Sequence, residues 1–161
     1  MRIGVPKEIK PQENRIGLTP DSVKTLVSEG HEVLVENNGG FEAGFDNDQY
    51  KNAGAKIIEK AADIFNDAEI IVKVKEPQKV EVEMIRENQI VYTYLHLAAA
   101  KELTEGLIKS KSINIAYETV TDDNGRLPLL APMSAVAGRM SVQAGAHCLE
   151  KNQKGRGLSL I

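Results

Sequence analysis

Cysteine and tryptophan are scarce in this chain of 161 residues, which has one cysteine, Cys148, and no tryptophan. A single cysteine cannot form an internal disulfide, and this favours a reducing compartment. The N-terminal segment lacks the apolar stretch of a signal peptide, and no run approaches the ~18 apolar residues that a membrane span needs. We therefore expect a cytoplasmic protein that makes no membrane contact.

Neither sign of charge dominates the sequence. Lysine and arginine number 20 against 23 aspartate and glutamate, for a net charge of −3. This balance gives no electrostatic reason to expect nucleic acid as a partner. The shares of hydrophobic residues (42%) and charged residues (27%) are typical of a globular domain. Small anionic ligands stay compatible, because a site can be locally basic on an acidic protein.

Common metal and nucleotide motifs are also missing. The sequence has no CxxC, HExxH or GxxxxGK[ST] pattern, so we expect no metal site and no P-loop. The stretch NNGGFEAGF, residues 37–45, invites comparison with a dinucleotide-binding loop. The GxGxxG spacing fails there, because Phe41 stands where the middle glycine should be. A plain surface loop is the better interpretation.

Short apolar runs alternate with helical patterns along the first 120 residues. Thr19 and Pro20 form a helix start, with threonine as the cap and proline in the first turn, and Gly30 ends that helix. Such alternation predicts an α/β fold with a mostly parallel sheet between two layers of helices. The expected strands are RIGVP, HEVLVEN, AKIIEK, EIIVKVK, QIVYTYL and INIAYETV, and the expected helices include 48–53, 61–66, 79–87 and 101–110. The sequence does not give the order of the strands.

The last part of the chain has a different pattern. Residues 131–151 form one long helical segment rich in alanine, glycine and serine, whose small side chains predict close packing against another element. A basic loop follows, and LSLI, residues 158–161, has the character of a strand that begins another domain.

Candidate functional residues lie where the expected parallel strands end, because ligands bind at that edge of open sheets. Arg15 follows the first strand, Lys75 ends EIIVKVK, and Tyr94 and His96 end QIVYTYL. A guanidinium fork suits a carboxylate, an ammonium suits a carbonyl or carboxylate oxygen, and a histidine can move a proton near neutral pH. Together these groups suit a small α-keto acid.

Each of these residues also has a structural interpretation. A lysine, arginine or histidine at a strand end is most often a solvated or hydrogen-bonded terminus. Lys73, inside the same run as Lys75, fits an edge strand protected against aggregation better than it fits catalysis.

Several sequence blocks resemble the bacterial alanine dehydrogenase family. They are MRIGVPKEIK, ENRIGLTP, VKVKEP, YLHLA, AYETV and LPLLAPMSAVAGRMSVQAGAHCLEK, so the resemblance runs along the whole chain. The transhydrogenase α-subunit shares the general plan but differs from the family at YLHLA and LPLLAPMS, and it is the second choice. The resemblance implies a Rossmann-like three-layer domain, residues 1–130, and a connecting helix, residues 131–151. Residues 152–161 then begin a nucleotide-binding domain.

The resemblance also implies a reaction and roles for individual residues. Alanine dehydrogenases reversibly convert L-alanine, NAD and water into pyruvate, ammonium and NADH. By resemblance, Arg15 and Lys75 hold the substrate, and His96 is the general acid and base. The same comparison places Tyr94 and Met133 in the pocket wall and Ser134 near the cofactor.

The family's NAD-binding glycines have no counterpart in these residues, so we expect the chain alone to lack an NAD site and to be inactive. It is then a truncated product, one half of a split enzyme that joins a separate NAD-binding fragment, or a remnant. A module that binds pyruvate or alanine without catalysis is the alternative from another class. Self-association into a homo-oligomer stays open.

Overall fold

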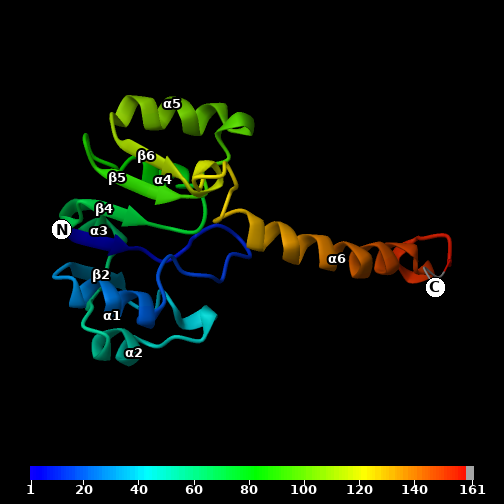
Figure 1. Ribbon diagram of the computed structural model, residues 1–161, viewed down its shortest axis with the longest axis horizontal. Helices are drawn as coiled ribbons and strands as arrows, with labels where there is room; N and C mark the ends of the chain where they lie inside the picture. The colour runs from blue at the N-terminus through cyan, green and yellow to red at the C-terminus, as the bar shows by residue number, and fades with distance from the viewer. Residues whose placement is uncertain (159–161) are drawn as a thin grey trace. The chain divides into compact units, whose positions relative to one another are not determined.

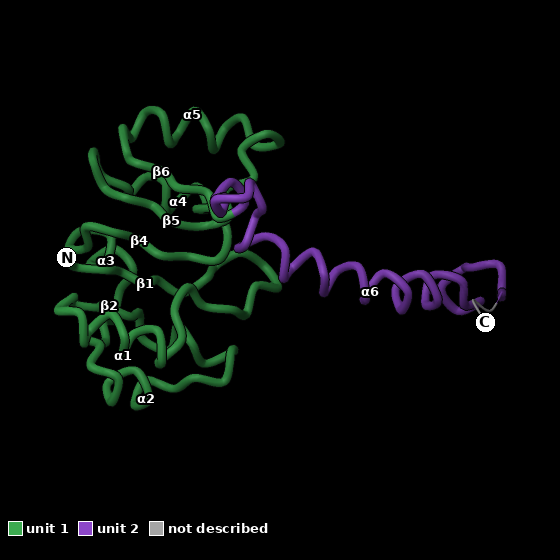
Figure 2. Tube along the Cα trace, viewed as in Figure 1, with its two compact units in different colours: residues 1–117 green, residues 118–161 purple. Residues whose placement is uncertain are grey.

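The computed structural model describes residues 1–158 and divides into two compact units after Tyr117 (Figure 2). The first unit holds the sheet, and the second holds a long helix. The finer division expected from the sequence, into residues 1–130, 131–151 and 152–161, stays a prediction. The strand expected from Leu158 onward falls almost entirely on residues 159–161, which lie outside the described part.

Six strands form one sheet in the order β3-β2-β1-β4-β5-β6, and every neighbouring pair is parallel (Figure 1). This confirms the α/β fold with a parallel sheet. The strands are β1 (Arg2–Val5), β2 (Glu32–Glu36), β3 (Lys56–Ile58), β4 (Ile70–Val72), β5 (Ile90–Thr93) and β6 (Ile113–Ala116).

The helices begin and end close to the predicted positions. They are α1 (Pro20–Ser28), α2 (Asn47–Asn52), α3 (Ala61–Asp67), α4 (Lys79–Val82), α5 (Lys101–Ser110) and α6 (Ala131–Leu149). The Thr19 side chain accepts a hydrogen bond from the Ser22 backbone N–H, as the capping pattern predicts. The helix expected over 79–87 is too long by more than a turn. Beyond α4, Arg86 and Gln89 turn away to donate side-chain hydrogen bonds to backbone carbonyls at the end of α3.

Two apolar clusters cover the two faces of the sheet. In β2, the side chains of Val33 and Val35 pack in the cluster that includes Val23 of α1, whereas Leu34 packs in the cluster that includes Ile64 of α3. Successive strand residues point to opposite faces, so this alternation means that helices lie on both sides. The first unit is therefore a three-layer domain.

The strand order reverses direction between β1 and β4. From β1 the chain runs through α1 to β2 on one side, and from β4 it runs through α4 to β5 on the other. The two loops that leave the carboxyl ends of β1 and β4 therefore diverge. A crevice for ligands forms at such a switch point in open parallel sheets.

The second unit contains α6, whose apolar side chains are exposed. Val136, Met140 and Val142 keep 62%, 52% and 64% of their surface accessible. The close packing predicted from the small residues of this helix stays a prediction. Over residues 1–158, no helix combines the length and the apolar character that a bilayer crossing requires.

Gly17 offers a test of how the loop after β1 closes over β4. A Cβ atom at this position would lie 2.5 Å from the carbonyl oxygen of Val72, and backbone cannot move aside as a flexible side chain can. We expect Gly17→Ala to lower the free energy of unfolding by about 1–3 kcal/mol, measured by urea denaturation. Gly138→Ala is the control, because a Cβ there meets nothing within 4 Å. Equal stabilities of both variants and the parent would contradict the close approach.

Candidate active site

Lys73 follows β4 and is fully buried, with no exposed side-chain surface. The edge-strand interpretation is wrong, because β4 lies between β1 and β5 in the middle of the sheet. The Lys73 ammonium lies 3.0 Å from Glu8 Oε2 and 2.8 Å from Glu81 Oε1. A buried ammonium needs such partners, because it loses its hydration shell. Burial raises the pKa of Glu81, although Lys73 opposes that rise.

Glu8 also binds the backbone that leads to the candidate substrate lysine. Its Oε1 atom accepts hydrogen bonds from the N–H groups of Val74 and Lys75, at 2.6 Å and 3.2 Å. Glu8 therefore joins the loop after β1 to the end of β4, with one carboxylate oxygen on the ammonium and the other on the backbone.

Lys75 is held on its other side by β5. Its carbonyl oxygen accepts a hydrogen bond of 2.8 Å from the hydroxyl of Thr93. The side chain keeps 21% of its surface exposed, and its Nζ lies 3.7 Å from Glu76 Oε2. The backbone of Lys75 is thus fixed from two sides, whereas its side chain stays partly exposed.

Arg15 lies in the loop after β1 and pairs with Glu13. Its Nε and its Nη2 donate to the two carboxylate oxygens of Glu13 at 2.8 Å and 2.7 Å, in the forked geometry that guanidinium prefers. The hydrogen bond from Arg15, together with the charges of Arg15 and Lys75, lowers the pKa of Glu13 to about 2. The influence of Lys75 on Glu13 means that both cations lie within electrostatic reach of the same carboxylate.

Tyr94 follows the end of β5 and is buried. Its ring is 7% exposed and meets the ring of Tyr117 edge to face, with 4.9 Å between the ring centres. Burial raises the pKa of Tyr117, so its hydroxyl stays protonated at neutral pH. Tyr94 also contributes to the raised pKa of Arg15, after the larger effect of the hydrogen bond to Glu13.

His96 occupies the point where the chain leaves β5. Its backbone is left-handed, with φ of 51°, and the residue is exposed. Strand parity therefore does not orient His96, because β5 ends at Thr93. The imidazole nevertheless lies nearly parallel to the Tyr94 ring, with 6.3 Å between the ring centres.

The structure thus gathers four of the six predicted site residues along one edge of the first unit: Arg15, Lys75, Tyr94 and His96. Met133 and Ser134 lie in the first turns of α6, in the second unit. Their part in the site stays a prediction from the family resemblance.

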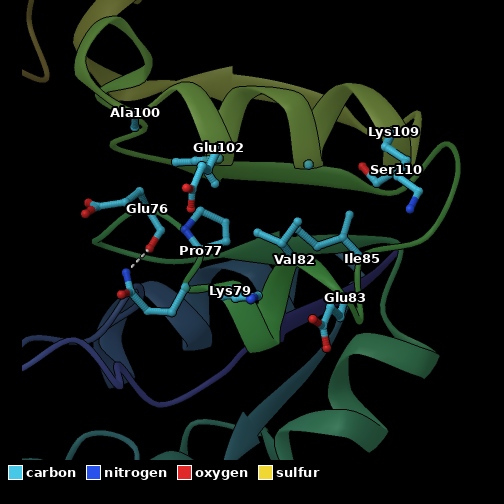
Figure 3. Close-up of a pocket in the computed structure, with 13 residues that line it drawn as sticks. Glu76, Pro77, Lys79, Val82, Glu83, Ile85, Ala100, Glu102, Lys109 and Ser110 are labelled. Atoms are coloured by element: carbon cyan, nitrogen blue, oxygen red, sulfur yellow. Dashed lines mark hydrogen bonds between the residues drawn. The ribbon is translucent and has the colours of Figure 1, made fainter.

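A cavity of about 690 Å³ lies elsewhere in the first unit, between α4 and α5 (Figure 3). Glu76, Pro77 and Ala100 line one end and Lys109 and Ser110 the other. The side-chain amide of Gln78 donates to the Glu76 carbonyl at 2.9 Å. None of the predicted site residues lines this cavity, so it differs from the site at the switch point.

The glycine-rich loop after β2 does not fit a dinucleotide. Gly40 is buried, and a Cβ there would lie 2.7 Å from the ring of Tyr50, so the glycine makes room for a tyrosine and not for a phosphate. The surface-loop interpretation holds for Phe41, which is 62% exposed, but not for Gly39 and Gly40. Within residues 1–158, no group of three or more histidine, cysteine, aspartate or glutamate side chains has a geometry that could hold a metal ion.

The first unit is thus an open parallel α/β domain, a class of fold in which ligands bind at the carboxyl edge of the sheet near a switch point. More particularly, the chain belongs to the family described as "Alanine dehydrogenase/PNT, N-terminal domain", whose model matches residues 4–137.

Individual relatives agree with this family. The chain is 53% identical to the alanine dehydrogenase of Halomonas elongata and 51% identical to that of Geobacillus stearothermophilus, each over 160 residues. These residues are 99% of this chain but 43% of each relative. A solved L-alanine dehydrogenase superimposes with a TM-score of 0.89 at 53% identity, covering 98% of this chain and 44% of that one. A transhydrogenase from Sinorhizobium meliloti gives 0.69 at 28% identity, covering 73% and 35%.

Sequence reasoning missed the carboxylates that organise the edge. Glu8, Glu13 and Glu81 each hold a cation there, and none was predicted. One signal could have found part of this set: a lysine inside an apolar run implies a buried ammonium, which demands acidic partners. Nothing in the sequence identifies which glutamates these are.

Removing the buried ammonium tests the cluster of Lys73, Glu8 and Glu81. Lys73→Met leaves two buried carboxylates without their cation, so the free energy of unfolding at pH 7 should fall by about 3–5 kcal/mol. The raised pKa of Glu81 should then rise further. A carboxyl group with a raised folded-state pKa stabilises the protein at low pH and loses that effect as pH rises. The deficit should therefore shrink at pH 5, and a deficit that does not change with pH would contradict the cluster.

The Glu13–Arg15 pair predicts an acid-resistant carboxylate. Carbon-13 NMR of the side-chain carboxyl should give a pKa of about 2 for Glu13, and Arg15→Gln should return that pKa toward 4.5. Because the folded-state pKa is depressed, the pair stabilises the fold above pH 4.5 and loses that effect as the pH falls toward 2. Glu32, held by Lys56 and Arg2, is the control, and its pKa should stay near 2 in the variant. An ordinary pKa for Glu13 in the parent would refute the pairing.

Proposed function

We propose that this chain supplies the substrate-binding half of an NAD-dependent L-alanine dehydrogenase site. The observation that carries the proposal is that Arg15 and Lys75 follow β1 and β4 at the switch point of the sheet, where Arg15 binds Glu13 and the charges of both residues lower the pKa of that carboxylate. Two cations around a carboxylate are what a small keto acid needs from its site. The chain spans under half the length of its alanine dehydrogenase relatives, so the activity of the whole enzyme is part of the proposal.

In this proposal the two cations divide the oxygens of pyruvate between them. Arg15 binds the carboxylate, which competes with Glu13 for the guanidinium fork. Lys75 binds the carbonyl oxygen, and its ammonium stabilises negative charge that develops there during the reaction. The guanidinium of an arginine suits a planar carboxylate, and the ammonium of a lysine suits a single oxygen. A variant in which the two residues are exchanged should therefore lose pyruvate binding.

His96 is the proposed general acid and base. It is exposed beyond the end of β5 beside Tyr94, and a histidine side chain can both donate and accept a proton in general acid and base catalysis. Tyr94 provides the wall that excludes water from one side of the substrate. The family resemblance implies further roles for Met133 as a pocket residue and for Ser134 near the cofactor.

NAD accepts and returns the hydride in this family's reaction. The described residues do not fit NAD, because the glycine loop after β2 is filled by Tyr50. NAD binding therefore belongs, in this proposal, to the part of the relatives that this chain does not span. The proposed partners are pyruvate or L-alanine and an NAD-binding segment, whether covalently attached or separate, in the cytoplasm.

A second candidate is a module that binds pyruvate or alanine without chemistry. The fold similarity to a transhydrogenase supports a wider use of this domain, since 73% of the chain matches that protein at 28% identity. Catalysis and simple binding differ in their dependence on NADH. A module should bind pyruvate independently of NADH, whereas an enzyme half joined to its nucleotide-binding segment should bind pyruvate more tightly when NADH is present.

An NMR titration of the chain with pyruvate tests the proposal. We expect saturable shifts of the His96 ring and the Lys75 amide, and Lys75→Ala should weaken binding at least tenfold because the carbonyl oxygen loses its cation. Lys109→Ala is the matched control, because it also removes one lysine charge, but from the cavity between α4 and α5. Binding by the control variant should equal that of the parent.

Two results would count against the proposal. A well-dispersed spectrum without shifts at Lys75 or His96 would mean that these residues form no pyruvate site in this chain. Shifts confined to Lys109 and Ser110 would place the ligand in the cavity between α4 and α5 instead.

A further inference from the structure

We propose that Glu8 is a positioning residue for the substrate lysine, Lys75. This inference rests on the proposed function, because it assigns Glu8 a task in holding the group that binds the carbonyl oxygen. Glu8 itself is not placed to bind the substrate, because it is only 6% exposed and both of its carboxylate oxygens bind groups within the protein.

The geometry gives Glu8 a direct hold on the backbone of Lys75. Oε1 accepts from the N–H groups of Val74 and Lys75, at 2.6 Å and 3.2 Å, and Oε2 lies 3.0 Å from the ammonium of Lys73. Consecutive N–H groups that point at one buried oxygen fix the orientation of the peptide between them. That peptide precedes the Cα of Lys75, so it sets the direction in which the side chain leaves the sheet.

The anchor acts where the sheet no longer provides one. β4 ends at Val72, and pairing with β5 continues through the Lys73 N–H, at 3.1 Å from the Tyr92 carbonyl, and the Val74 carbonyl, at 3.2 Å from the Tyr94 N–H. The N–H groups of Val74 and Lys75 point toward the β1 side, where β1 has already ended at Val5. Glu8 therefore takes the place of a strand for these two donors.

Glu81 is a natural control for this role. It binds the same ammonium, with Oε1 at 2.8 Å from Lys73 Nζ, and it is also buried. Its second oxygen, however, accepts from the N–H of Gln78, the N-cap residue of α4, and not from residues 74 or 75. Lys73 has two carboxylate partners, so either glutamate can lose its charge and still leave one ion pair. Glu8→Gln and Glu81→Gln thus make the same change of charge in the same cluster.

Pyruvate affinity measured by NMR separates positioning from general stability. Glu8→Gln should weaken pyruvate binding about tenfold, the effect of a lost or misdirected charged hydrogen bond, whereas Glu81→Gln should stay within about twofold of the parent. Propionate lacks the carbonyl oxygen that Lys75 binds and keeps the carboxylate that Arg15 binds. Its affinity should therefore be the same in all three proteins, which a loosened fold would not preserve.

Amide hydrogen exchange gives a readout that needs no ligand. Exchange at Val74 and Lys75 should accelerate in Glu8→Gln and remain slow in Glu81→Gln, with unchanged rates in β1 and β5. If Glu8→Gln does not fold, Glu8→Asp keeps the charge and shortens the reach, and it should show the same pattern.

The outcomes divide clearly. Equal losses of pyruvate affinity in Glu8→Gln and Glu81→Gln, or a parallel loss of propionate affinity, would overturn the positioning role. If the parent protein binds no pyruvate, the proposed function fails, and exchange alone then decides whether Glu8 holds Lys75. Unchanged exchange at Val74 and Lys75 in Glu8→Gln would overturn the inference in that case too.

Discussion

The ion cluster of Lys73, Glu8 and Glu81 is the constraint on which the edge of this domain depends. A fully buried ammonium at the centre of the sheet requires anions, and they arrive from the loop after β1 and from α4. Breaking a buried pair leaves an uncompensated charge, so these segments are held where the cluster places them. Glu8 also binds the backbone of Lys75, so the buried ion cluster is connected directly to a residue of the candidate substrate site.

The local elements of this fold were accessible from sequence, and their assembly was not. Thr19 with Pro20 predicted the start of α1, and the apolar runs predicted all six strands to within a few residues. The strand order depends on β1 pairing with β4, whose residues lie more than 60 positions away. No local pattern specifies that choice. The region after α4 also differed from its predicted helix. Arg86 and Gln89 bind a backbone carbonyl at the end of α3, and such a contact between distant segments does not enter local helix propensity.

The candidate site likewise contains residues that the sequence indicated and residues that only the structure revealed. Arg15, Lys75, Tyr94 and His96 could be named because they follow strands, and the carboxyl ends of parallel strands share one edge. Lys73 was misjudged, because a lysine in an apolar run looks like a solvent-facing edge residue until its partners are known. Its partner Glu8 lies 65 positions away. Sequence thus indicated the cations of the proposed site, and the anions that hold those cations in place required the structure.

In the proposed site, the two cations are held in different ways. Lys75 is fixed through its backbone, by Glu8 on one side and Thr93 on the other, so the direction in which its side chain leaves the sheet is set before a ligand binds. Arg15 is fixed through its guanidinium, which donates hydrogen bonds to Glu13. A ligand carboxylate must displace Glu13 to accept the same hydrogen bonds. A ligand with only a carboxylate exchanges one charge-assisted pair for another and gains little. In the proposed site a keto acid also binds Lys75 through its carbonyl oxygen, so the proposed selectivity for such a ligand arises from the lysine, although both residues carry the same charge.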